Sequence, residues 1–472
     1  MKKIRDKLNE KKNKTALIIN NGKKITYKYL VRLVENFTTY ISENSLIILK
    51  ASNTLESIVV YLGAIFSNST VILIGENDYM GNYIDAYNPK YIIIPKFVKE
   101  TFLNYKKTKE FYNYIILENK IFSFEFVNDI AVLLSTSGST GNPKCVKISY
   151  ENLLSNTESI INSLKIKEND ITITTLPMNY SYGLSIINTH LYCGATIVLC
   201  NYSVIQKKFW DSFLKYKVNN FGGVPFTYEI MLKLKSLNRD RLKNIRYLTQ
   251  AGGKLNKRDL KQMINLAEEN GFDFIVMYGQ TEATARMSYL PWEYASKKIN
   301  SIGIPIIEGQ FKIYDEKNTE IFVPYQKGEL IYIGKNVTLG YAYGWRNLVN
   351  KRDEWGGILY TGDMAYFDED GFYYLVGRKK RIAKICGQRI SLYDIEKILD
   401  DLGIRGICAE KNNNLYILIK EKNCNENTIH IELKKKINIS KEFVKVFFVD
   451  DFPRNDYGKI IYDISKWNLG VK

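Results

Sequence analysis

The sequence contains little histidine or cysteine and no long hydrophobic run. Its 472 residues include two histidines, which excludes a metal centre built from several histidines. The six cysteines form no Cys-x-x-Cys pair, so we expect neither a zinc ribbon nor a thioredoxin-like motif. They are also too sparse for a disulfide framework, which favours a reducing compartment. The basic N-terminus lacks the apolar segment of a signal peptide, and no run is long enough to span a membrane. We therefore expect a soluble cytoplasmic protein.

Positive charge is abundant but unevenly distributed. The formal net charge is +17, of which the first 28 residues carry +8, residues 378–472 carry +7 and the long middle carries only +2. A nucleic-acid enzyme of this size more often has a basic stripe across its body. We therefore expect no nucleic-acid partner, and we interpret the N-terminal lysines as a solvated face. A nucleic-acid-binding protein that exploits the net charge remains the non-enzymatic alternative.

Short apolar runs alternate with helical patterns through the first half. This alternation predicts α/β layers with largely parallel sheets. Turn signals between residues 314 and 371 then indicate hairpins and a smaller β-rich subdomain. The expected strands are Ser45–Lys50, Thr70–Ile74, Tyr91–Ile94 and Asp129–Leu134, with a helix over Thr26–Glu43.

The character of the chain changes after Gly377. A basic stretch follows, and Ser391 stands three residues before Asp394, a pattern like a capping box that opens a helix. A hairpin over 406–420, a helix near 428–437 and a strand near 443–449 complete a compact α+β unit. We thus predict an α/β protein with a large N-terminal domain, residues 1–377, of layered sheets plus the β-rich subdomain. A small mobile α+β domain, residues 378–472, follows it.

The most informative motif is a Ser/Gly-rich loop from Ser135 to Lys144, with the sequence STSGSTGNPK, after an expected strand. Small residues let backbone N–H groups approach an anion closely, and hydroxyl groups add further donors. Lys144 adds a charge that suits phosphate. Only two residues separate Gly138 from Gly141, so the loop does not match a Walker A motif, and a P-loop kinase is disfavoured.

With six further motifs in order, this loop resembles the signature of the adenylate-forming superfamily, which includes acyl-CoA synthetases, peptide-synthetase adenylation domains and luciferases. The resemblance covers about residues 15 to 465. The further motifs are Leu176–Leu184 (LPMNYSYGL), Tyr278–Glu282 (YGQTE), Tyr360–Asp363 (YTGD), Gly377–Lys380 (GRKK), Gly387–Ile390 (GQRI) and Pro453–Lys459 (PRNDYGK).

The resemblance implies an ATP-dependent reaction in which a carboxylate attacks the α-phosphorus, giving an acyl-adenylate and pyrophosphate. Both reactants are anionic, so catalysis relies on charge neutralisation and in-line positioning. The acyl group then passes to the thiol of CoA or of the phosphopantetheine arm of an acidic carrier protein. In this scheme the small domain swings between the two steps, and Lys380 is the hinge.

The resemblance also implies the roles of individual residues. Considered one at a time, Asp363 could be a turn residue, Glu282 a helix cap and Lys459 a surface lysine. Only the joint order of the motifs favours a role for these residues in the reaction. Ser137, Gly138, Ser139, Thr140, Gly141 and Lys144 would hold the β- and γ-phosphates, Thr281 would contact the α-phosphate and Glu282 would bind Mg²⁺. Tyr278 would stack on adenine, Asp363 would bind the ribose hydroxyls, Arg378 would support the nucleotide, and Lys459 would stabilise the transition state.

Three residues depart from the family pattern. Cys145 stands where a glycine usually follows the loop, and we expect a buried structural thiol there. Tyr180 stands where many acyl-CoA synthetases have histidine, so substrate or gating differs. Tyr462 stands where the C-terminal motif usually ends in arginine.

The acid substrate is expected to lack an α-amino group. Amino-acid-activating members place an aspartate near Ser181, but no acidic residue occurs from Ile171 to Val198, and a buried ammonium without a carboxylate is costly. An amino-acid–carrier-protein ligase is the second enzymatic reading. A catalytically inactive binding module is disfavoured because Glu282, Asp363 and Lys459 are present. The expected pocket lining is Tyr180, Tyr182, Phe226, Gly253 and Met277.

Overall fold

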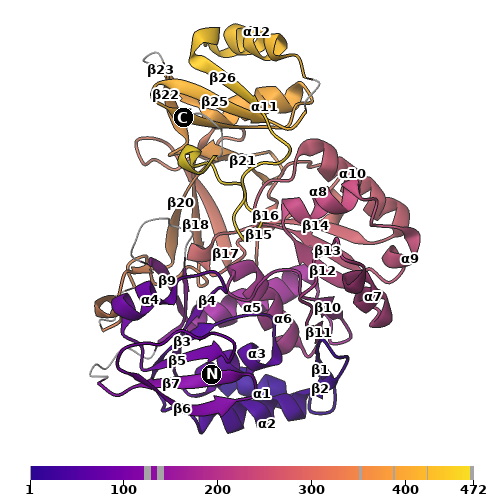
Figure 1. The fold of residues 1–472 in the computed structure, drawn as a ribbon. Helices are drawn as coiled ribbons and strands as arrows, with labels where there is room; N and C mark the ends of the chain where they lie inside the picture. Colours follow the sequence, from indigo (N-terminus) through magenta and orange to yellow (C-terminus); the bar gives the residue numbers. More distant parts are fainter. Residues whose placement is uncertain are drawn as a thin grey trace.

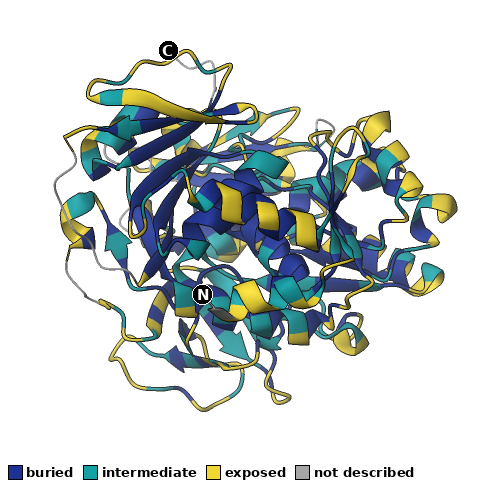
Figure 2. Cartoon of the chain, turned by 90° about the horizontal axis from the view of Figure 1, so that it is seen from below, coloured by how far each residue is buried: buried dark blue, intermediate teal, exposed yellow. Residues whose placement is uncertain are grey.

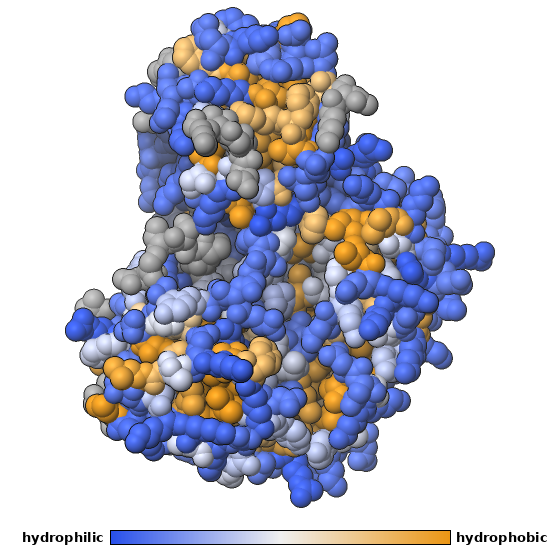
Figure 3. Space-filling view, in the orientation of Figure 1, coloured by the Kyte–Doolittle hydropathy of each residue, from blue (hydrophilic) through white to orange (hydrophobic). Residues whose placement is uncertain are grey.

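The computed structural model describes residues 2–121, 129–135, 143–349, 353–385, 388–421 and 424–467. A large layered body carries a smaller C-terminal part, which is joined to it by a narrower waist (Figure 1). Within the described ranges, no helix is both long and apolar enough to cross a membrane. Hydrophilic residues cover most of the face in Figure 3, and hydrophobic residues gather in patches on both parts.

The first large sheet has the strand order β19-β9-β8-β4-β3-β5-β7-β6, with β3, β4, β5 and β8 parallel. These central strands are fully buried apolar runs, as strands covered on both faces must be. The expected strands are therefore confirmed within one residue at each end. The bounds are β3 Leu46–Lys50, β4 Thr70–Ile74, β5 Tyr91–Pro95, β6 Tyr105–Phe111, β7 Tyr114–Asn119, β8 Ile130–Ser135, β9 Cys145–Ser149 and β19 Tyr341–Ala342.

The second large sheet has the order β16-β15-β14-β13-β12-β10-β11-β1-β2, again parallel at its centre. Because parallel strands begin and end together, the segments that follow β10, β12, β13 and β14 meet at one edge. The bounds are β1 Thr15–Ile18, β2 Lys24–Thr26, β10 Ile171–Ile173, β11 Thr196–Val198, β12 Asn220–Gly223, β13 Tyr247–Gln250, β14 Asp273–Tyr278, β15 Ser288–Tyr289 and β16 Ile304–Pro305.

Helices fill the space between the two sheets and cover their outer faces. One core joins strands of both sheets to α2, α3, α5 and α6, and a second places α7, α8 and α10 against β12–β14. The strands are mostly buried, whereas the outer helices expose one face (Figure 2). The helices are α2 Tyr27–Thr38, α3 Leu55–Phe66, α4 Met80–Tyr87, α5 Tyr150–Leu164, α6 Ser181–Cys193, α7 Lys207–Lys215, α8 Pro225–Lys233, α9 Arg239–Leu242 and α10 Lys257–Asn270.

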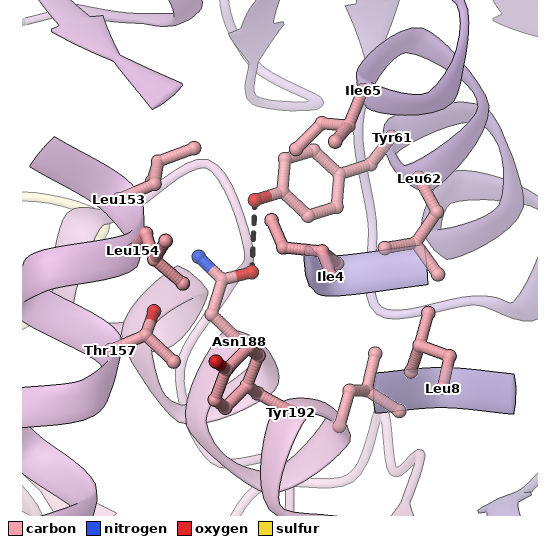
Figure 4. Close-up of a pocket in the computed structure, with 11 residues that line it drawn as sticks. Ile4, Leu8, Tyr61, Leu62, Ile65, Leu153, Leu154, Thr157, Asn188 and Tyr192 are labelled. Atoms are coloured by element: carbon pink, nitrogen blue, oxygen red, sulfur yellow. Dashed lines mark hydrogen bonds between the residues drawn. The ribbon is translucent and has the colours of Figure 1, made fainter. Parts of the chain in front are cut away.

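The basic N-terminus is a docked helix, α1 (Lys2–Glu10), whose exposed side carries Lys3 and Arg5, in agreement with the expected solvated face. Ile4 and Leu8, four residues apart, lie on one helix face and line a small cavity of about 30 Å³ between α1, α3, α5 and α6 (Figure 4). The charged side chains find acidic partners on the body. These ion pairs are Lys3–Glu158, Arg5–Glu35, Lys11–Glu168 and Lys14–Glu168.

The β-rich subdomain and the C-terminal α+β unit follow the predicted pattern. An antiparallel sheet in the order β17-β18-β20-β21 leads up to the waist, and Ser391 caps α11 as expected by accepting a hydrogen bond from the N–H of Asp394. The bounds are β17 Gly309–Tyr314, β18 Gly328–Gly334, β20 Ile358–Phe367, β21 Tyr373–Arg378, β22 Ile382–Ile385, β23 Gln388–Ser391, α11 Leu392–Asp401, β24 Gly406–Lys411, β25 Asn414–Ile419, α12 Glu426–Ile437 and β26 Val444–Phe448. The layered α/β fold class is thereby confirmed.

Candidate functional site

The site lies where the second sheet, the β-rich subdomain and the C-terminal part meet. Tyr278 ends β14, and Thr281 and Glu282 lie in the 3-10 turn that follows. Asp363 on β20 stands opposite Arg378 on β21 in the antiparallel register. The topology therefore brings together residues that are up to 100 positions apart in sequence.

Asp363 is the centre of one hydrogen-bonded group. The residue is 4% exposed. Oδ2 accepts from Tyr278 Oη at 2.5 Å and from Gln280 Nε2 at 2.9 Å, and Oδ1 accepts from Arg378 Nε at 2.9 Å. Burial lowers the pKa of Arg378, but Asp363 and its neighbours outweigh it, so the pKa is raised overall. Sequence reasoning missed Gln280, whose position inside the YGQTE motif was the available signal.

The turn that carries Thr281 and Glu282 is held rigidly. Thr281 Oγ1 lies 3.1 Å from Ser181 Oγ at the start of α6. Glu282 Oε1 accepts from Tyr341 Oη at 2.9 Å. Thr284 has a φ of 67°, in the left-handed region, and its hydroxyl donates to the carbonyl of Asn336 at 2.7 Å. Non-glycine residues rarely adopt this conformation, and here the surrounding contacts enforce it.

In sequence, the Ser/Gly motif runs from Ser135, the last residue of β8, to Lys144, just before β9. Its residues Ser137, Gly138, Ser139, Thr140 and Gly141 lie outside the described residues. At its end, Lys144 Nζ lies 3.3 Å from the centroid of the Tyr341 ring, the same tyrosine that bonds Glu282. The loop therefore ends beside Glu282. The neighbouring Cys145 is buried, as expected, and burial raises the pKa of its thiol to about 12.

Glu282 is also the residue expected to bind Mg²⁺, and its surroundings can be compared with that role. Across the described ranges, no cluster of three or more His, Cys, Asp or Glu side chains could form an all-protein metal cage. Mg²⁺ prefers oxygen ligands and is usually held by one or two carboxylates together with substrate phosphates and water. A single carboxylate beside the end of the Ser/Gly loop suits that mode of binding.

Lys459 reaches the site from the C-terminal part. Its loop is shaped by Asn455, whose Oδ1 accepts from the N–H groups of Lys459 at 2.9 Å and Tyr457 at 3.1 Å. Lys459 Nζ lies 5.1 Å from the centroid of the Tyr180 ring. Burial lowers the pKa of Lys459, the nearby charge of Arg378 lowers it further, and Glu282 opposes the shift. Lys459, Arg378 and Glu282 thus influence one another electrostatically.

Two sets of contacts hold this loop on the body. The ring of Tyr457 stacks on Tyr180, with centroids 4.9 Å apart and an interplanar angle of 16°, and its hydroxyl accepts from Asn179 Nδ2 at 2.9 Å. Arg454 pairs with Glu229 on α8 at 3.0 Å. A cleft of about 450 Å³, which Tyr457 also lines, lies beside the docked loop.

The expected pocket residues lie around Lys459, with one difference. Tyr180, Tyr182 and Met277 are buried in one core, and Phe226 lies under Arg454, 4.4 Å from its guanidinium carbon. Gly253 is exposed. The neighbouring Gly252 faces the site instead, because a Cβ there would lie 2.5 Å from Tyr180 Oη and 3.7 Å from Lys459 Cε.

The predicted hinge residue, Lys380, is exposed in the turn between β21 and β22. Its basic neighbours are largely paired within the protein: Lys379 contacts Glu329 at 2.6 Å and Arg381 contacts Glu396 at 2.9 Å. Tyr462, the departure from the family's arginine, lies under Arg381 at 3.8 Å. Much of the charge in this basic stretch is therefore neutralised locally.

Solved structures with the same fold can be superposed on nearly the whole length of this chain. The o-succinylbenzoate CoA synthetase (MenE) from Bacillus subtilis, in complex with the acyl-adenylate intermediate OSB-AMP, matches with a TM-score of 0.77 and 20% identity over 98% of this chain and 97% of that one. ATP-bound MatB from Rhodopseudomonas palustris matches with a TM-score of 0.79 and 19% identity over 98% of both chains. At these identities the likeness concerns the fold alone.

Curated relatives match at higher identity over part of their length. The chain is 29% identical to an oxalate–CoA ligase of Saccharomyces cerevisiae, 29% to a 2-succinylbenzoate–CoA ligase of a Geobacillus strain, and 31% to an oxalate–CoA ligase of Arabidopsis thaliana. Each match covers 71% of this chain, and 62%, 68% and 67% of the respective relative. The model of the AMP-binding enzyme family matches residues 4–342, which include the loop and turn described above. The chain belongs to the family of AMP-binding enzymes.

Proposed function

We propose that this protein activates a carboxylic acid with ATP as an acyl-adenylate and transfers the acyl group to a thiol, that of CoA in the first instance. The observation that carries this proposal is that Lys459, partly buried beside Tyr180, lies near enough to Arg378 and Glu282, from two other segments of the fold, for both charges to shift its pKa. The CoA ligases among the relatives support CoA as the acceptor. The phosphopantetheine arm of an acidic carrier protein is the alternative acceptor.

In the first step, a carboxylate oxygen of the acid forms a bond to the α-phosphorus of ATP. The bond from the α-phosphorus to the bridging oxygen of pyrophosphate breaks, and pyrophosphate leaves with the electron pair. Lys459 neutralises charge that develops on the α-phosphate and on the incoming carboxylate. Thr281 donates its hydroxyl to the α-phosphate, and Arg378 adds positive charge nearby.

The remaining residues hold the nucleotide. Tyr278 offers its face to adenine, and Asp363 accepts from the ribose hydroxyls. Glu282 would hold Mg²⁺, which, when bound, neutralises phosphate charge and orients the leaving group. The β- and γ-phosphates are held by the Ser/Gly loop, namely Ser137, Gly138, Ser139, Thr140, Gly141 and Lys144.

In the second step, the thiol sulfur attacks the acyl carbon, AMP leaves and the thiol proton passes to solvent. Lys459 is committed to the first step, so its loop has to withdraw to open the acyl carbon to the thiol. We propose that residues 378–472 move as one unit against residues 1–377 about Lys380. Exposed Lys380 lies between Lys379, which pairs with Glu329 of the body, and Arg381, which pairs with Glu396 of the C-terminal part, so a rotation at Lys380 can leave both pairs in place.

ATP–pyrophosphate exchange across a panel of carboxylic and amino acids tests the proposal. We expect exchange that depends on an acid and that Lys459→Ala lowers by roughly 10²- to 10³-fold, the effect of removing one transition-state charge contact. Lys466→Ala, which removes an exposed lysine of the same segment, is the matched control. Exchange that Lys459→Ala leaves intact, or that needs no acid, would refute the proposal.

A further inference from the structure

Arg286, eight residues after Tyr278, is a buried arginine without an acidic partner. Its side chain belongs to a residue that is 2% exposed. Through the part of the chain that the structure describes, no ion pair includes it, and its Nε has no hydrogen-bond partner. Arginines at this depth normally pair with a carboxylate, because an unpaired buried charge is strongly unfavourable.

The surroundings of Arg286 do not replace that partner. Nη1 lies 3.4 Å from the sulfur of Met277, which is a weak acceptor. The guanidinium carbon lies 4.7 Å from the centroid of the Tyr182 ring. His190, also close by, is buried, and burial lowers its pKa to about 4, so it is neutral. The guanidinium therefore faces an aromatic ring and a thioether, and its Nε donor is left without a partner.

The backbone of Arg286 is fixed where it is. Its carbonyl accepts from Asn156 Nδ2 at 2.8 Å and from Asn336 Nδ2 at 3.2 Å. Burial lowers the pKa of the guanidinium, but arginine stays protonated in proteins. The protein thus holds a fixed, buried positive charge, and none of the ion pairs among the described residues neutralises it.

This charge lies at the inner end of a row of side chains that starts at Lys459. Lys459 Nζ is 5.1 Å from the Tyr180 ring, the Tyr180 and Tyr182 rings are 6.3 Å apart, and Arg286 is 4.7 Å from Tyr182. The two tyrosines connect the lysine at the reacting carboxylate with the buried arginine. Met277, predicted to line the acyl pocket, contacts Arg286 directly.

We propose that Arg286 binds a second carboxylate of the acid substrate, at the opposite end from the carboxylate that is activated. The inference rests on the proposed function and specifies its substrate class as dicarboxylic acids. A planar guanidinium pairs with a carboxylate through two parallel hydrogen bonds. Such a pair satisfies the Nε donor that lacks a partner, and it agrees with the absence of acidic residues from 171–198, where an ammonium-bearing substrate would need one.

Matched acids of equal chain length test this inference in the exchange assay: succinate against butyrate, adipate against hexanoate and suberate against octanoate. The ω-hydroxy acids of the same lengths serve as uncharged acceptors. We expect the wild-type protein to favour one diacid over its monoacid by roughly 10²-fold in kcat/KM, the scale of a charge-assisted buried contact. Arg286→Met should collapse this ratio, mainly through KM for the diacid. Arg239→Met, at an exposed position, should leave the ratio unchanged.

The outcomes separate this inference from the proposed function. Three results would overturn the inference and leave the proposed function standing. They are faster exchange with monoacids than with diacids, faster exchange with hydroxy acids than with diacids, and an equal loss of exchange with all acids in Arg286→Met. If no acid supports exchange, calorimetric titration of the same acids decides: diacid binding that Arg286→Met removes supports the inference, and its absence overturns it. Should Arg286→Met fail to fold, Arg286→Lys keeps the charge but loses the paired donors, and it should raise KM for the diacid alone.

Discussion

Replacing Tyr457 tests whether the docked loop is what makes the protein competent for the first half-reaction. Tyr457 contributes two contacts to docking: its ring stacks on Tyr180 at 4.9 Å, and its hydroxyl accepts from Asn179 at 2.9 Å. Both join the C-terminal part to the body, and both position the loop that ends in Lys459. Tyr457→Phe removes the second contact alone, and Tyr457→Ala removes both.

The expected magnitudes follow from these contacts. A net hydrogen bond contributes about 1 kcal/mol, so Tyr457→Phe should lower the rate of adenylate formation about fivefold. An aromatic stack adds about 1 kcal/mol or slightly more, so Tyr457→Ala should cost about 2 to 3 kcal/mol, or roughly 30- to 150-fold. These values are upper limits. If nearly all molecules are docked in the wild type, part of the lost docking free energy can be removed before the docked fraction, and with it the rate, falls.

The assay compares the two half-reactions in the same variants. Pyrophosphate exchange reports adenylate formation, and thioester formation from synthetic acyl-adenylate and CoA reports the second step. We expect the first to fall and the second to remain at the wild-type rate, with exposed Tyr79→Phe as a control. An equal fall in both rates would indicate general destabilisation. No change in Tyr457→Ala would show that the stack does not contribute to docking. Either result refutes the reasoning.

Three further predictions concern titration, the hinge and a thiol. Because burial and Arg378 lower the pKa of Lys459, exchange should decline at a lower pH than an ordinary lysine allows. In Arg378→Ala the pKa should rise and the alkaline limb of the pH profile should move to higher pH, whereas an unmoved limb would assign it to another group. Lys380→Pro should slow thioester formation by more than about tenfold while exchange persists, and a normal second step would exclude the proposed hinge. Cys145, with its pKa raised to about 12 by burial, should resist iodoacetamide at pH 8 in the native state and react after denaturation, as mass spectrometry would show.

Strand positions could be predicted closely because buried strands of a parallel sheet are continuous apolar runs. The run Thr70–Ile74 coincides with β4. Helix ends were harder: α2 begins after Thr26, as expected, but ends at Thr38 rather than Glu43. There the hydroxyls of Thr38 and Thr39 donate to carbonyls three residues back, a local competition with the helix that apolar periodicity does not report.

The remaining differences arise from tertiary contacts. The spacing of Ile4 and Leu8 is a helix signal in the N-terminal segment, but the acids that pair with its lysines are up to 157 positions away. Whether Gly252 or Gly253 faces Lys459 depends on the turn after β13. The sequence does not show whether a buried arginine pairs with an acidic residue. Arg286 could therefore be recognised only once its burial and its contacts in the structure were known.

The hydrogen bond between Asp363 and Arg378 has a consequence for regulation by ligands. Arg378 is the last residue of β21, and the turn at Lys380 begins directly after it. A ligand that draws the Asp363 carboxylate into its own hydrogen bonds weakens the hold on the strand that leads into this turn. By thermodynamic linkage, the orientation of residues beyond the turn must change the affinity for that ligand by the same factor as the ligand changes the orientation. The ratio of the nucleotide affinities of two variants, each locked in one orientation, thus measures that coupling free energy.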